Sequence, residues 1–153
     1  MKPITDKFMI YDVKKHRYVL TSEAIAQLGI NIESRMAQLG VPSAIVINRL
    51  VDKISMRIYS YLYRFNDSKC LQFLIAFSPS AREIVKLAME EQAEYLFTLG
   101  DLSLVADEQK QKINISPQSR EILDNQIVDE TGVPLTYMGG YGFVPPPYSE
   151  GEY

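Results

Sequence analysis

The residue types best suited to catalysis are scarce in this sequence. The single histidine, His16, lies between Lys15 and Arg17, and the single cysteine, Cys70, lies in an apolar stretch. A catalytic nucleophile needs a positioned base, and that base needs an orienting group. No sequence feature supplies an orienting carboxylate for His16. We therefore expect His16 to be solvated, Cys70 to be buried and inert, and the protein not to be an enzyme.

Metal and cofactor sites are not predicted either. One histidine and one cysteine cannot build a Cys/His zinc site within one chain. The acidic residues Asp101, Asp107 and Glu108 lack the spacing of a calcium loop. The glycine-rich stretch 139–142 lacks the lysine and the following helix of a phosphate-binding loop. We expect no metal and no cofactor.

Charged residues gather on the faces of two predicted helices. Four cations share one face of a helix over 42–66, and we call them the basic ridge: Arg49, Lys53, Arg57 and Arg64. Three carboxylates share a flank of a helix over 79–99, and we call them the acidic ridge: Glu83, Glu90 and Glu94. Such ridges are usually solvated and contribute little to stability. Our hypothesis is that these two ridges meet across a head-to-tail interface and set the register of subunits.

The helix over 42–66 carries a second apolar face beside its core stripe. The core stripe contains Ile47, Leu50, Val51, Ile54, Ile58, Tyr61, Leu62 and Phe65. The second face contains Ile45, Met56, Tyr59 and Tyr63. A helix needs only one apolar face for its own fold, so the second face predicts a packing partner. That partner is either another helix of the same chain or a neighbouring subunit.

The elements that must position these residues are mostly helical. Capping residues, prolines and glycines predict helices over 21–28, 42–66, 68–77, 79–99 and 116–125, with a loop over 101–115. Thr21 or Ser22 caps the first helix, and Ser80 with Glu83 forms a capping box in the fourth. Outside the C-terminal region, only residues 17–20 resemble a strand. The sequence predicts a mainly α fold: an extended N-terminal segment (1–20), a small helical bundle (21–125) and an extended C-terminal arm (126–153).

The C-terminal arm differs from the rest of the chain in composition. It is rich in proline, glycine and tyrosine, which disfavour a helix. From residue 126 onward there is no Lys or Arg, and four carboxylates give the arm a charge of −4, which leaves +1 of the net −3 for the rest of the chain. We predict that the arm lies outside the core. Its predicted docking residues are Tyr137, Tyr141, Phe143 and Tyr148.

Length and overall charge limit the classes of protein that fit. A chain of 153 residues suits one domain, and a net charge of −3 is too small for general attraction to nucleic acid. The N-terminus lacks the apolar run of a signal peptide, and no stretch is long and apolar enough to span a bilayer. We expect a small intracellular protein without membrane contact.

The order of short sequence features resembles that of a known family. These features are Tyr11-Asp12, the segment 17–21, Asn48-Arg49, the segment 58–61, the helix segment 88–95, the segment 100–103 and Ile115-Ser116-Pro117. Over about residues 9–125 the chain resembles the head-to-tail connector proteins of tailed bacteriophages, which are also called adaptor or head-completion proteins.

The resemblance implies a structural role in virion assembly. It implies a helical bundle that docks beneath the portal protein as a homo-oligomeric, typically dodecameric, ring in the virion neck, after assembly in the host cytoplasm. The ring extends the channel through which DNA passes without sequence-specific binding, and it is the platform for the tail or the next neck protein. Extended termini of this family commonly reach into neighbouring subunits or the portal. The alternative is a small helical regulator that binds DNA or a protein partner through the basic ridge.

Overall fold

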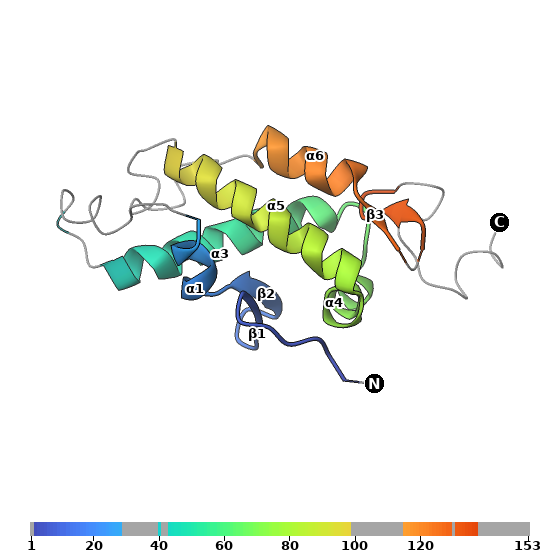
Figure 1. The fold of residues 1–153 in the computed structure, drawn as a ribbon, viewed down its shortest axis with the longest axis horizontal. Coiled ribbons are helices and arrows are strands. Elements are labelled where there is room, and N and C mark those ends of the chain that lie inside the picture. The colour runs from blue at the N-terminus through green and yellow to red at the C-terminus, as the bar shows by residue number, and fades with distance from the viewer. Residues whose placement is uncertain (1, 29–39, 41–42, 99–114, 130, 138–153) are drawn as a thin grey trace.

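The computed structural model describes residues 2–28, 40, 43–98, 115–129 and 131–137. The described part is mainly helical, as predicted. Its elements are β1 (Met9–Asp12), β2 (Arg17–Leu20), α1 (Ser22–Ala26), α3 (Ser43–Leu62), α4 (Ser68–Phe77), α5 (Pro79–Thr98), α6 (Pro117–Asn125), β3 (Ile127–Val128) and β4 (Val133–Pro134). Helix α5 is central, because it packs against α3, α4 and α6 (Figure 1).

The helix starts follow from their capping residues. The Thr21 side chain accepts a hydrogen bond from the Ala24 amide, and the Ser116 side chain accepts one from the Ser119 amide. Both caps satisfy amides that have no partner within the helix, so the predicted starts near 21 and 116 are confirmed.

One predicted helix end and one predicted capping residue are wrong. Helix α3 ends at Leu62 rather than near 66, because the next amides bond three residues back (Arg64 to Tyr61 and Phe65 to Leu62) in a tighter turn. Helix α5 is capped by Ser78 rather than by a Ser80–Glu83 box: the Ser78 side chain accepts from the Ala81 amide at 3.1 Å. Since Pro79 occupies the first helical position, the cap falls on the residue before it.

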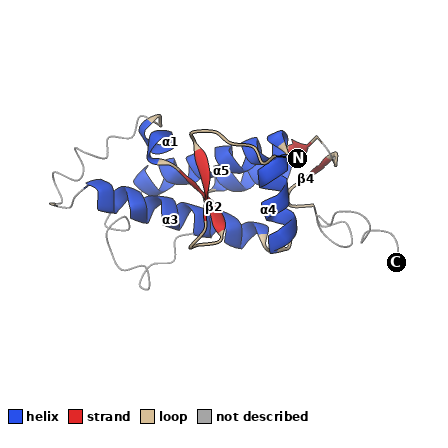
Figure 2. Ribbon diagram, turned by 90° about the horizontal axis from the view of Figure 1, so that it is seen from below, coloured by secondary structure: helices blue, strands red, loops and turns tan. Residues whose placement is uncertain are grey.

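The N-terminal segment, predicted to be extended, folds back on itself as a β-hairpin. The predicted strand at 17–20 is confirmed as β2, and it pairs antiparallel with β1, which was not predicted. His16 has a positive φ of 56° at the end of the turn. The hairpin lies across α3 (Figure 2) and buries Met9, Tyr18 and Leu20 in the core.

The predicted arm boundary at 126 is wrong, because the first part of that segment belongs to the core. Val128 and Leu135 are each 0% exposed, and strands β3 and β4 form a short antiparallel hairpin. The Asn66 side-chain amide donates to the Leu135 carbonyl at 2.6 Å, so this hairpin is tied to the end of α3. Val128 and Leu135 provide this packing, although the average composition of the segment does not reveal them. The described chain ends at Tyr137.

The core lies between α3, α5 and the elements that cover them. The predicted core stripe of α3 is buried or half-buried in full, and α5 contributes Ile84, Val85 and Ala88 to the same core. Among the described helices, none combines the length and the apolar character that crossing a membrane requires.

Candidate functional site

The predicted basic ridge divides in the structure. Arg49 and Arg64 are exposed and Arg57 is half-buried, but Lys53 is only 6% exposed. The prediction that Lys53 lies on a solvated face is therefore wrong. A lysine stem can pack along apolar side chains, and the wheel angle alone does not show what covers a face.

Two ridge arginines line an open groove between α3 and α6. The groove has a volume of about 800 Å³, and its walls include Arg57 and Tyr61 from α3, Arg64 from the turn that follows α3, and Arg120, Glu121 and Asp124 from α6. We call it the arginine groove. The sequence places Arg57 and Arg64 on one face, but it gives no sign that Arg120 lies opposite them, because that depends on how α6 packs.

Tyr61 holds the two walls of the arginine groove together. Its hydroxyl donates a hydrogen bond to Asp124 Oδ1 at 2.7 Å. The guanidinium carbons of Arg64 and Arg120 each lie 5.7 Å from the Tyr61 ring centroid, within cation–π range. Burial and the hydrogen bond with Asp124 raise the Tyr61 pKa above its ordinary value. The ring therefore stays neutral at physiological pH and positions two cations at the groove.

The groove arginines have more donors than the nearby carboxylates satisfy. The closest approach between Arg120 and Asp124 is 3.7 Å, which is a loose contact on an exposed surface. Within the described part of the chain, Arg57 and Arg64 form no ion pair at 4.0 Å or less. Guanidinium groups bind carboxylate or phosphate oxygens through paired hydrogen bonds. The arrangement is suited to an anionic ligand.

The second apolar face of α3 is partly covered. Ile45, Met56 and Tyr63 are 44%, 37% and 47% exposed, and we call these three residues the exposed stripe. Tyr59 is 1% exposed, so of the two partners left open for this face, the one within the same chain covers this residue. Other elements of the same chain therefore cover Tyr59, whereas the side chains of the exposed stripe remain open to solvent.

Tyr59 is buried because the N-terminal hairpin and α4 cover it. Its hydroxyl accepts from the Tyr18 amide and donates to the Gln72 side chain, each at 2.8 Å. Gln72 in turn donates to the His16 carbonyl at 2.6 Å. Desolvation raises the Tyr59 pKa. The residue is a buried link between α3, α4 and the hairpin.

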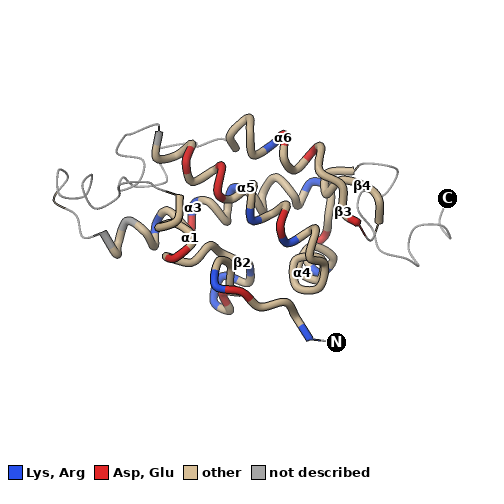
Figure 3. The backbone as a smooth tube through the Cα atoms, viewed as in Figure 1, with Lys and Arg blue, Asp and Glu red and all other residues tan. Residues whose placement is uncertain are grey.

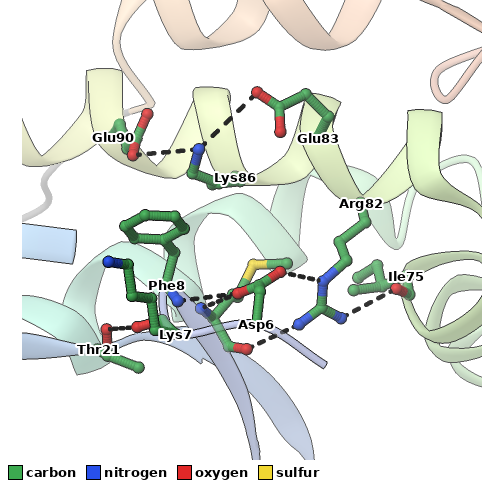
Figure 4. A network of polar contacts seen from close by, with 10 residues as sticks. Asp6, Lys7, Phe8, Thr21, Ile75, Arg82, Glu83, Lys86 and Glu90 are labelled. Atoms are coloured by element: carbon green, nitrogen blue, oxygen red, sulfur yellow. Dashed lines mark hydrogen bonds and ion pairs between the residues drawn. The ribbon is translucent and has the colours of Figure 1, made fainter. Parts of the chain in front are cut away.

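The predicted acidic ridge contains a cation that sequence analysis passed over. Lys86 Nζ lies 3.8 Å from Glu83 and 3.9 Å from Glu90, and it also lies over the Phe8 ring (Figure 4). Burial raises the Glu90 pKa, and Lys86 opposes that effect. Both signs of charge occur along α5 (Figure 3), and Glu94 is exposed. The acidic character of the flank is therefore partly neutralised within its own helix.

Arg82 forms the densest polar network of the described residues, and sequence analysis did not single it out. Only 5% exposed, it donates to Asp6 Oδ2 at 2.8 Å and to the carbonyls of Ile75 and Met9 (Figure 4). Desolvation opposes ionisation of Asp6, but hydrogen bonds from Arg82 and two backbone amides hold its pKa below the ordinary 3.8. This network fixes the N-terminal segment to α4 and α5.

The candidate catalytic residues lie where they were expected. His16 is exposed in the hairpin turn, and Cys70 is buried, where desolvation raises the pKa of its thiol to about 11. In the residues that the structure describes, no cluster of three or more His, Cys, Asp or Glu side chains is arranged to hold a metal.

Of the predicted docking residues, the structure places one. Tyr137 is 43% exposed at the end of the β3–β4 region. Tyr141, Phe143 and Tyr148 lie outside the described residues.

Comparison with known proteins adds no family assignment. No protein-family model, no curated protein and no solved structure matches this chain.

Proposed function

We propose that this chain is a structural head-to-tail connector of a tailed bacteriophage. It assembles into a homo-oligomeric ring beneath the portal protein, extends the DNA channel and carries the tail or the next neck protein. The sequence resemblance over about residues 9–125 suggests this role. The observation that carries it is a pair of different surfaces, the arginine groove and the exposed stripe, on two faces of α3.

A subunit of a ring that also holds a further protein needs one surface for the neighbouring subunit and a different surface for that protein. The arginine groove is polar and cationic, whereas the exposed stripe is apolar and aromatic. Aromatic and methionine side chains are enriched in the centres of protein interfaces. We assign the exposed stripe to the contact with a neighbouring subunit and the arginine groove to an acidic segment of a partner.

The arm contributes a third contact in this proposal. Because Leu135 is buried, a deletion that tests the arm must begin after Tyr137. Deleting residues 138–153 is expected to leave a folded helical body that no longer joins the portal or the tail. Normal incorporation of this variant into particles would contradict the assigned role of the arm.

The decisive experiment for the proposal is a reconstruction of purified particles at side-chain resolution. It is expected to show the helical body as a ring between the portal and the tail. Purified particles that lack the chain altogether would overturn the proposal.

A second candidate is a helical regulator that binds DNA through the basic ridge. The observation that favours it is the convergence of three arginines on one groove. Such a regulator binds duplex DNA with an affinity that falls steeply as salt rises. A connector is expected to show negligible affinity for duplex DNA at physiological salt.

A further inference from the structure

The arginine groove raises the question of what occupies it in a single subunit. Its three guanidinium groups face only two nearby carboxylates, Glu121 and Asp124. A volume of about 800 Å³ lies within the range of pockets that enclose a sizeable ligand. Ile115 and Pro117 add apolar surface to the wall formed by α6. The expected occupant therefore combines negative charge with apolar or aromatic groups.

The chain itself contains a segment of that composition. Residues 138–153 carry Glu150 and Glu152 and no Lys or Arg, so their charge is −2. The acidic residues follow Pro145–Pro147 and Tyr148. A proline run favours the extended polyproline conformation, which docks on aromatic surfaces at a small cost in chain entropy. Tyr61 is itself only 6% exposed, so the surfaces open to such a segment are the two guanidinium groups beside its ring and the apolar wall of Ile115 and Pro117.

The point at which the described chain ends also favours the same subunit. Thr136 donates to the Leu123 carbonyl at 3.3 Å, and Leu123 immediately precedes the groove residue Asp124. From Tyr137 to Glu150 the chain can span up to about 43 Å when extended. Helix α6 has 9 residues and is therefore about 14 Å long. The reach exceeds the length of the groove wall several times over.

We infer that residues 145–152 of the same chain occupy the arginine groove in the free subunit, with Glu150 and Glu152 paired to the groove arginines. Because the segment is joined to the groove by only a few residues of chain, its effective concentration there is in the millimolar range, so the same chain outcompetes a second copy at ordinary protein concentrations. The acidic segment thus covers the groove until a partner displaces it. This inference does not depend on the proposed phage role.

A nucleic acid is the less suitable occupant. Three arginines provide only a few phosphate contacts, which give weak binding at physiological salt.

The test uses the full chain with a spin label attached at position 149 through Ser149→Cys. Cys70 is 7% exposed and its thiol pKa is raised to about 11, so the label reacts at the new cysteine. In a chain that carries both the spin label and ¹⁵N, the label broadens the NMR signals of nearby amides. We therefore expect weaker amide signals at Arg64, Arg120 and Glu121. The signals are expected to return in about 1 M salt, where the Debye length falls to about 3 Å.

Two matched variants establish the specificity of the contact. Neutralising the arm (Glu150→Gln with Glu152→Gln) or the groove (Arg57→Gln with Arg64→Gln) is expected to restore most of the lost signal. Lys69→Gln, an exposed cation outside the groove, is expected to leave the loss unchanged. Equal signal loss in all variants would overturn the inference.

A mixed sample separates the same chain from a second copy. Spin-labelled chain without ¹⁵N is mixed with ¹⁵N-labelled chain without the spin label. We expect no signal loss at the groove in this mixture and an undiminished loss in the doubly labelled chain on dilution. Signal loss of equal size in the mixture would assign the groove to a second copy and overturn the inference.

A titration with nucleic acid tests the remaining alternative, which is that the groove is open to a phosphate backbone in the native chain. At low salt, where a few phosphate contacts already give measurable binding, a short oligonucleotide is expected to shift the groove amides of the arm-neutralised variant more strongly than those of the native chain, because the native arm competes. Equal shifts in both chains would show that the arm does not occupy the groove, and they would overturn the inference.

Discussion

Arg82 and the arginines of the groove are the same residue type in opposite situations. Arg82 is 5% exposed, and its guanidinium donates to one carboxylate and two backbone carbonyls. Arg57, Arg64 and Arg120 line an open groove, where the closest ion pair is a 3.7 Å contact. The first guanidinium has its hydrogen-bonding capacity used inside the fold, whereas the others retain theirs for a ligand.

This difference teaches that residue type and helical position do not separate stabilising cations from binding cations. Arg82 joins three segments that are distant in sequence. Without it, one carboxylate and two backbone carbonyls lose the hydrogen bonds that its guanidinium donates. In the groove, Arg64 and Arg120 instead lie over the ring of Tyr61. The predictions below test whether stability and binding divide between these two sets of residues.

The largest effect is expected for Arg82→Ala. Removing one partner from a buried charged network typically costs about 3–5 kcal/mol. We expect the free energy of unfolding, measured by urea denaturation, to fall by that order. Arg57→Ala is the matched control. A loss below about 0.5 kcal/mol for Arg82→Ala would contradict the stabilising role of this network.

The next effect is expected for Tyr59→Phe. The change leaves the shape of the ring but removes the partner of the Tyr18 amide and of Gln72. A buried donor without a partner costs about 1–3 kcal/mol, which the same denaturation experiment measures. Tyr63→Phe, at an exposed position, is the control and is expected to be near neutral. Equal losses for the two variants would contradict the assignment of Tyr59 to the core.

A smaller effect is expected from the ionisation of Asp6. Its folded-state pKa lies below its ordinary value, so its contribution to stability is present above about pH 4 and is lost as pH falls through the folded-state pKa. Asp6→Asn is expected to flatten this acid limb of the stability curve and to cost about 1 kcal/mol at neutral pH. The difference between the two curves isolates Asp6 from Glu90, whose raised pKa acts in the opposite direction. Parallel curves would contradict the role of Asp6.

The smallest effect on stability is expected in the groove. Replacing Arg57, Arg64 and Arg120 together by Gln is expected to change the free energy of unfolding by less than about 0.5 kcal/mol per site. The reason is that exposed cations without close ion pairs contribute little to the fold. A loss as large as that of Arg82→Ala would show that the groove arginines are structural.

Local sequence signals predicted the helical part of the fold well. Thr21, Pro79, Ser116 and Pro117 mark helix starts through hydrogen-bonding rules that act within a few residues, and the core stripe of α3 follows from helical spacing alone. These features do not depend on distant parts of the chain.

Contacts between distant segments could not be predicted in the same way. Tyr59 lies outside the core stripe on the helical wheel, and it is buried because the β1–β2 hairpin and α4 cover it. Arg120 belongs to the groove because α6 packs beside α3, and Arg82 reaches Asp6 across 76 positions of sequence. The sequence therefore predicted one wall of the candidate site, with Arg57 and Arg64, but not Arg120 on the opposite wall.

The most direct test of the division between the two sets of arginines is the incorporation of the triple groove variant into particles. The variant Arg57→Gln, Arg64→Gln and Arg120→Gln is supplied in place of the native chain, and its copies per purified particle are counted. Our account predicts a protein as stable as the native chain that is nevertheless missing from the particles. Incorporation at the native level would contradict the assignment of the groove arginines to binding.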